Sequence, residues 1–127
     1  MSHISKRSTR MDKRHILFAA CRALGATTRE NTQITYYGGR KQAVQIGVEH
    51  PSFRQGFGLG FDLNRSTGTF EAVGDLSFGG HDAFLGDLTM EYSKQEVLEA
   101  AASVGHELVS TQTQGGKVVL TFSAYVG

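Results

Sequence analysis

Five histidines and one cysteine are the side chains of this chain that could bind a metal or act as a nucleophile. The histidines are scattered, and no two of them have the spacing of a zinc-binding pair on one element: His3, His15, His50, His81 and His106. Cys21 falls on an apolar helix stripe, where burial would keep its thiol unreactive. We therefore expect no catalytic residue, no metal site and no cofactor.

Carboxylates gather around a glycine-rich segment in the second half of the chain, where a pair could serve as acid and base: Asp75, Asp82, Asp87 and Glu91. Simpler roles account for them. Asp82 is expected to cap a short helix, and Asp87 and Glu91 are four residues apart on a polar helix face. We interpret this group as ordinary protein surface.

Basic residues in the first half of the chain form a candidate binding set: Lys6, Arg7, Arg10, Lys13, Arg14, Arg40 and Lys41. Clustered Lys and Arg can bind phosphates without reading a base sequence. However, the formal net charge is only +1, and no aromatic residues stand beside the basic ones to stack on bases. A solvated face or protein-partner surface is the leading interpretation, and nucleic-acid or anion binding is the alternative.

The charge of the chain is unevenly distributed. Residues 1–54 contain ten Lys and Arg against three Asp and Glu, and residues 55–127 contain three against nine, so the halves carry +7 and −6. If each half folds as its own lobe, the basic and acidic residues face away from each other. One molecule's basic end could then meet another's acidic end. We therefore expect self-association or a protein partner.

Three glycines alternate with bulky apolar residues in the middle of the chain: Gly56, Gly58 and Gly60. In a strand this pattern leaves one sheet face without side chains, so a partner, a helix or a flat ligand could approach the backbone closely. The alternative is that the glycines only admit the domain's own helix.

The last third of the chain contains the clearest structural pattern. Ser93 and Glu96 have the spacing of a capping box, and an amphipathic stripe follows: Val97, Leu98, Ala101 and Val104. Gly105 is expected to end this helix. Two alternating runs, His106–Thr113 and Lys117–Tyr125, then flank Gly115-Gly116 and predict a hairpin with a type I′ turn.

The first half of the chain repeats this helix-and-hairpin pattern. A basic strand, Ser2–Met11, precedes a helix that Asp12 is expected to cap and Gly25 to end. Its stripe is Ile16, Leu17, Ala20, Cys21 and Leu24. An offset of eighty residues aligns Leu17 with Val97 and Leu24 with Val104, which predicts that all four are buried against one sheet.

The remaining segments complete an α+β fold. Strands are expected at Thr32–Tyr37 and Gln42–Val48 around Gly38-Gly39, then at Gln55–Leu63 and Thr69–Phe78, and a short helix begins at Asp82. We predict a mostly antiparallel sheet of about seven strands with the helices on one face. The fold would be a pseudo-repeat of two helix-plus-hairpin units.

The length of 127 residues predicts one domain, residues 1–127, with repeat halves 1–50 and 55–127 on either side of a loop at Pro51. No apolar run approaches the ~20 residues of a membrane span. The apolar run after the first basic residues is too short for a secretion signal. We expect a soluble protein of the cytoplasm or of the equivalent plastid stroma.

Short motifs over nearly the whole chain are similar to those of a known family: Met1-Ser-His-Ile-Ser5, the Tyr37-Gly-Gly39 turn before Gln42-Ala-Val44, Phe84-Leu-x-x-Leu88 with Tyr92, Val97-x-x-x-Ala101-x-x-x-Gly105 and Gly116-x-x-x-Leu120. The chain resembles the Ycf35-like family, also called DUF1257, of small proteins from cyanobacteria, algal plastids and other bacteria. The resemblance implies neither an established activity nor catalytic residues.

The sequence favours a non-enzymatic protein-interaction module, such as a subunit or adaptor of a larger assembly. The alternative is a nucleic-acid or anion-binding protein that uses the basic N-terminal half. An enzyme is the third interpretation.

Overall fold

The computed structural model describes residues 4–77 and 79–124. In chain order the elements are β1 (Ser5–Ser8), α1 (Arg14–Ala23), β2 (Thr27–Tyr36), the 3₁₀ turn η1 (Tyr37–Gly39), β3 (Arg40–Glu49), β4 (Leu59–Asn64), β5 (Thr69–Gly74), α2 (Asp82–Ser103), β6 (His106–Gln114) and β7 (Lys117–Ala124). The predicted α+β class is confirmed. Neither helix in these ranges combines the length and the apolar character needed to cross a membrane.

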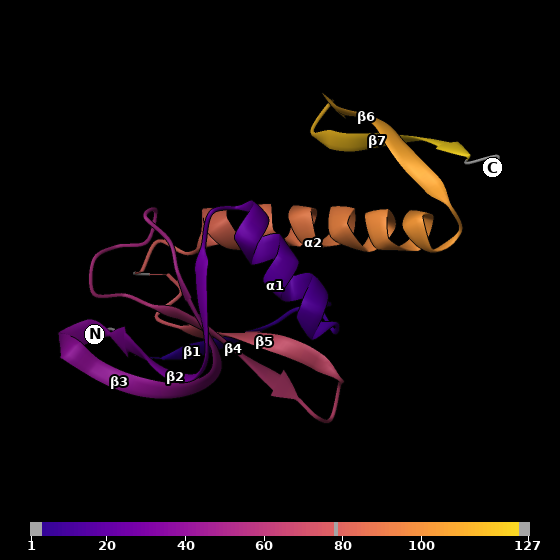
Figure 1. Ribbon diagram of the computed structural model, residues 1–127. Coiled ribbons are helices and arrows are strands. Elements are labelled where there is room, and N and C mark those ends of the chain that lie inside the picture. Colours follow the sequence, from indigo (N-terminus) through magenta and orange to yellow (C-terminus); the bar gives the residue numbers. More distant parts are fainter. Residues whose placement is uncertain (1–3, 78, 125–127) are drawn as a thin grey trace.

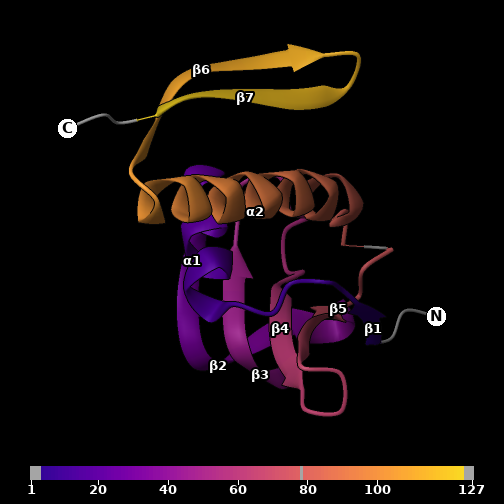
Figure 2. The same ribbon diagram turned by 90° about the vertical axis from the view of Figure 1, so that its right-hand side faces the viewer.

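The strands form two separate antiparallel sheets. One sheet has five strands in the order β1-β5-β4-β3-β2, and the other is the β6–β7 hairpin alone. Both helices lie above the five-stranded sheet, and the hairpin lies on the far side of α2 from that sheet (Figures 1 and 2). Helix α2 therefore separates the hairpin from the main body of the domain.

The core lies where one face of the five-stranded sheet meets both helices. Helix α1 contributes Ile16, Leu17, Ala20 and Cys21, and the N-terminal half of α2 contributes Phe84, Leu85, Leu88 and Tyr92. Strands β3 to β5 contribute Ile46, Val48, Leu59, Phe61, Phe70 and Ala72. The α1 stripe is confirmed except at Leu24, which is half-buried against this cluster.

Ser93 does not begin a helix, which corrects the predicted capping box. Helix α2 runs without a break from Asp82 to Ser103, so Ser93 lies in its interior, and the expected short helix is the first half of α2. Asp82 is its first residue rather than its cap. The helix continues through Ser93 because the buried stripe of the first half extends to Tyr92, while Glu96 binds the ammonium of Lys13 instead of the Ser93 amide.

Asp12 is also not a helix cap. Helix α1 begins at Arg14, the cap position is Lys13, and no side chain caps it. Instead, the backbone N–H groups of Asp12 and Lys13 donate to the hydroxyl oxygen of Tyr92 at 3.1 and 2.8 Å. A side chain distant in the sequence thus holds the residues just before α1, while no described side chain caps the helix itself.

The prediction of a single sheet of about seven strands is wrong, because the seven described strands form one sheet of five and one of two. The predicted burial of the second helix stripe is wrong as well: Val97 is 46% exposed and Val104 is 67% exposed. The helix-then-hairpin order does occur twice, as α1-β2-β3 and α2-β6-β7. The two hairpins belong to different sheets, so the C-terminal half of α2 packs on a narrow hairpin and not on a broad sheet.

The predicted turns are confirmed, and the strand boundaries shift. Gly115 and Gly116 have φ angles of 56° and 77°, as a type I′ hairpin requires, and Gly25 and Gly105 also take positive φ values after the helices. Strands β1, β4 and β5 are shorter than predicted. The parts of the predicted elements at residues 2–3, Phe78 and Tyr125 lie outside the described residues, as does His3.

Candidate interaction surface

The β6–β7 hairpin is the most exposed part of the described chain. No residue of β6, and none of residues 117–123 in β7, is buried. Helix α2 is the element that packs against both strands. Residues 118, 120 and 122 are half-buried and residues 119, 121 and 123 are exposed, so Val118, Leu120 and Phe122 form the side that faces α2.

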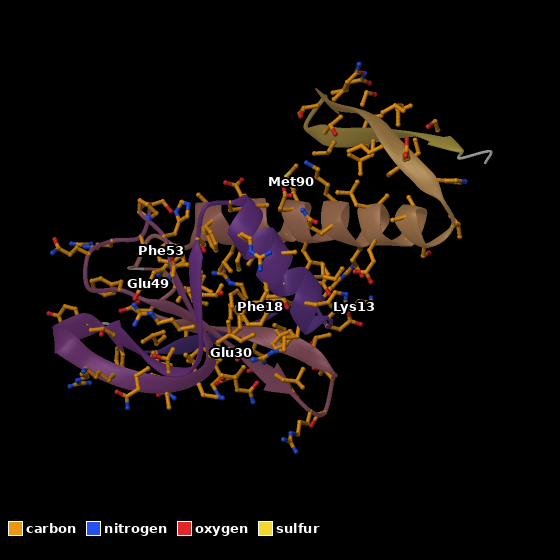
Figure 3. The ribbon with its side chains drawn as sticks, viewed as in Figure 1. Lys13, Phe18, Glu30, Glu49, Phe53 and Met90 are labelled. Atoms are coloured by element: carbon orange, nitrogen blue, oxygen red, sulfur yellow. The ribbon has the colours of Figure 1, made fainter. Side chains whose placement is uncertain are left out.

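Exposed apolar side chains extend from the second half of α2 across the hairpin. They are Val97, Val104, Leu108, Val109 and Val119, which we call the C-terminal surface. Val104 and Val109 are the most exposed, at 67% and 58%. Met90 is 47% exposed and points from α2 toward the side where the hairpin lies (Figure 3). Leu108 pairs with Phe122 and lies on the side toward α2, whereas Val119 lies on the opposite side, so exposed apolar residues occur on α2 and on both faces of the hairpin. This apolar area is available to a partner.

The two hairpin strands differ in regularity. Leu108 pairs with Phe122 and Ser110 with Thr121, so Val109 is an extra residue that makes a bulge in β6. Strand β7 contains no such bulge between Lys117 and Ala124. The outer edge of β7 is therefore the more regular of the two free edges of this small sheet.

The basic N-terminal residues do not face away from the acidic half, which corrects the predicted charge separation. Arg7 binds Asp82 and Lys13 binds Glu96, both at 2.9 Å, and His15 Nε2 lies 2.8 Å from Glu99. Helix α2 thus brings the acidic residues to the N-terminal segment. These pairs are exposed and contribute little to stability, but they cancel much of the charge difference locally.

The structure divides the predicted basic set into paired and unpaired residues. Arg14 forms an ion pair with Glu30, in addition to the pairs of Arg7 and Lys13. Lys6, Arg10, Arg40 and Lys41 form no ion pair within the described ranges. Arg40 and Lys41 lie on β3 next to the β2–β3 turn, whereas Lys6 and Arg10 lie on or after β1 at the opposite edge of the strand order.

Several hollows of the molecule have polar side chains in their walls. A groove of about 680 Å³ lies between residues 7–11 and one face of α2, with Arg7, Arg10, Asp82 and Glu96 in its walls. A second hollow of about 340 Å³ lies between the β2–β3 hairpin and the loop at residues 53–58. Neither wall contains a buried polar group without a partner, so nothing in them indicates a specific ligand.

The three glycines do not form one bare strip. Gly56 lies in a loop before β4, with φ at 81°. A Cβ at Gly58 would come within 3.0 Å of Ile34, and one at Gly60 within 2.5 Å of Val44. Ile34 and Val44 belong to a second small cluster, with Val73 and Ile4, that does not include the helices. Gly58 and Gly60 therefore admit side chains from neighbouring strands and not from a helix, while a Cβ at Gly56 would meet open space.

A buried loop that the sequence patterns did not indicate lies between β5 and α2. Asp75 is 6% exposed and His81 is fully buried, so the interpretation of Asp75 as surface is wrong. The His81 ring packs edge-on against Phe53 and its Nε2 lies 3.2 Å from the Phe57 carbonyl oxygen. Burial lowers the pKa of His81, which keeps the ring neutral. The Gly79-Gly80 pair is the sequence feature that could have indicated this buried loop, because a Cβ atom at position 79 would lie 2.6 Å from the His81 ring.

The described residues contain no cluster of three or more His, Cys, Asp or Glu side chains that could hold a metal ion. Cys21 is completely buried, and burial raises the pKa of its thiol to about 12. A thiol with this pKa is protonated near neutral pH and is a poor nucleophile.

Comparison with protein families assigns the chain to one of them. Residues 20–121 match the family described as "Protein of unknown function (DUF1257)". The match spans the last turn of α1, all of α2, the five-stranded sheet apart from β1, and nearly all of the hairpin. No curated protein and no solved structure matches the chain. The chain belongs to the DUF1257 family, as its short motifs predicted.

Proposed function

We propose that this DUF1257 protein is a non-enzymatic protein-interaction module, such as a subunit or adaptor of a larger assembly, and that it docks through its C-terminal surface. One observation carries the proposal. Strands β6 and β7, of nine and eight residues, form a sheet of their own, and none of their residues whose burial is described is buried. Helix α2 packs against one side of this hairpin, which helps to stabilise it, but residues 119, 121 and 123 on the other side are left in solvent. A further protein surface over the exposed side would bury the apolar area that α2 leaves uncovered.

The position of the hairpin supports the same conclusion. It lies on the outer side of α2, away from the core (Figure 2), so a partner could reach it without disturbing the five-stranded sheet. The exposed side chains of Val104 and Val109 are aliphatic and not charged, and solvent contact with them is unfavourable. Binding of a partner would remove this apolar area from water.

The proposal is tested by co-purification from the source organism with the full chain as bait. The variant Val104→Glu/Val109→Glu changes two exposed residues and should fold as the wild type does. The control Gln55→Glu/Ser66→Glu adds the same charge at exposed loop positions elsewhere. We expect specific proteins to co-purify with the wild type and the control and to be lost from the variant. Identical sets of co-purifying proteins from all three would contradict the proposal.

Anion or nucleic-acid binding remains the second candidate function, now limited to four cations. Lys6, Arg10, Arg40 and Lys41 are the members of the basic set without an ion pair in the described ranges. Filter binding of nucleic acid over a salt series tests this candidate, because phosphate contacts weaken steeply with salt. Arg40→Gln/Lys41→Gln should weaken such binding, and Arg22→Gln/Arg65→Gln, which alters exposed residues outside the set, should not. Absence of binding at low salt would eliminate this candidate.

A further inference from the structure

We propose that the partner on the C-terminal hairpin is a second copy of this chain, joined through antiparallel pairing of the outer edges of the two β7 strands. This inference rests on the proposed function and names the partner of the β7 edge, which borders the C-terminal surface at Val119. The product would be a two-fold dimer with a four-stranded sheet in the order β6-β7-β7-β6. The four-stranded sheet would pair backbone groups on the outer edge of β7, which has no neighbouring strand among the described residues of one copy.

The choice of β7 follows from the difference between the two free edges. The bulge at Val109 interrupts β6, and bulges are one of the features by which proteins protect an edge strand from pairing. Strand β7 has no bulge or proline, and its single charge is Lys117 at one end. Alternate residues in the range 118–124 direct backbone donors and acceptors to the outer edge, where no described strand of the same sheet pairs with them.

The side-chain pattern of β7 is complementary to itself. Antiparallel pairing must place side chains of the same sheet face opposite each other. With Leu120 opposite Leu120 of the second copy, Val118 lies opposite Phe122, and Val119 lies opposite Thr121. All six half-buried apolar side chains then meet on the face toward the α2 helices. Packing on α2 covers these side chains only in part, and a second copy would cover more of each of them.

Charge also favours a second copy over a foreign chain. In this register Lys117 lies opposite Ser123 of the second copy, so the two lysines stand at opposite ends of the interface and do not repel each other. Between Val118 and Ala124 there is no charged residue that would select an oppositely charged partner. The pairing therefore depends on backbone hydrogen bonds and apolar contacts and should tolerate salt.

The test is the mass of the full chain by light scattering or sedimentation from micromolar to near-millimolar concentration, at low and high salt. We expect the wild type to have twice the mass of the 13.8 kDa chain at both salt concentrations. The variant Val119→Lys/Thr121→Lys changes two exposed residues and places lysines directly opposite lysines across the proposed interface. We expect a twofold loss of mass for this variant, with an unchanged circular dichroism spectrum.

Two further measurements locate the interface. The control Gln112→Lys/Gln114→Lys adds the same charge to exposed residues of β6 and should remain dimeric. A mixture of Val119→Lys/Thr121→Lys with Val119→Glu/Thr121→Glu should recover the dimer mass, because each lysine then faces a glutamate. A monomeric wild type, or a β7 lysine variant that stays dimeric, overturns the second-copy inference. If the wild type is monomeric and Val104→Glu/Val109→Glu still loses co-purifying proteins, the proposed function stands and the occupant is a foreign protein.

Discussion

The hydroxyl of Tyr92 donates a hydrogen bond of 3.0 Å to the carboxylate of Asp12, which lies eighty positions earlier in the sequence. The same oxygen accepts the backbone N–H groups of Asp12 and Lys13, so one buried side chain of α2 holds the start of α1 in place. The hydrogen bond from Tyr92 also lowers the pKa of Asp12, since it stabilises the carboxylate. This contact joins the two helices above the sheet at a position that no local pattern indicates.

Tyr92→Phe should therefore destabilise the protein by about 1–3 kcal/mol, because two backbone donors lose a partly buried acceptor. Urea unfolding with a common m-value measures the difference. Tyr36→Phe is the matched control, because the Tyr36 hydroxyl makes no hydrogen bond within the described ranges, and it should change stability by less than about 0.5 kcal/mol. Equal effects of the two substitutions would contradict this role of Tyr92.

The two halves of α2 should respond differently to loss of side-chain volume. Leu88 is fully buried in the core, so Leu88→Ala should cost about 2–5 kcal/mol. Val97 is 46% exposed, so Val97→Ala should cost less than about 1 kcal/mol in the monomer. Chemical denaturation at a concentration where the chain is monomeric makes the comparison. A large loss at Val97 would mean that it is buried in solution.

Stability should fall as the pH decreases through the ordinary pKa of histidine because of His81. Burial lowers the pKa of His81 in the folded state below its usual 6.5, although Asp75 and Asp82 oppose the shift. Below that pH the unfolded chain binds a proton that the folded chain does not, so acid favours unfolding.

Unfolding free energies between about pH 7.5 and 5.5 test this prediction. His81→Gln should reduce the slope of stability against pH. His106→Gln, at an exposed position, should leave the slope unchanged. A slope that does not respond to His81→Gln would show that other groups produce the pH dependence.

Cys21 should not react with thiol reagents in the folded protein. The side chain is completely buried, and its pKa of about 12 leaves almost no thiolate near neutral pH. A disulfide-exchange reagent should label Cys21 only after denaturant is added. A variant with an added exposed thiol, Ala102→Cys, should be labelled once in the folded state. Rapid labelling of native wild type would show that the α1 stripe opens readily.

The sequence by itself determined the local structure of this protein. The spacing of Ile16, Leu17, Ala20 and Cys21 matches one face of a helix, and these residues are buried in the structure. The turns at Gly115-Gly116 and the helix ends at Gly25 and Gly105 were also predicted correctly, because backbone conformation there depends on a few neighbouring residues. The family motifs could also be recognised in the sequence, because each of them is a short pattern of neighbouring residues.

Only the tertiary structure decided which strands share a sheet, which charges pair and which polar residues are buried. The β6–β7 hairpin has the same alternating pattern as a core hairpin, yet it forms a separate sheet beyond α2. Alternation along a strand sets which side chains share a face, but it does not specify which sheet the strand joins. Asp82 was predicted to face away from Arg7 and instead binds it. Asp75 was read as surface and is buried. Each outcome depends on contacts between segments far apart in the chain, and those contacts form only when the layers pack.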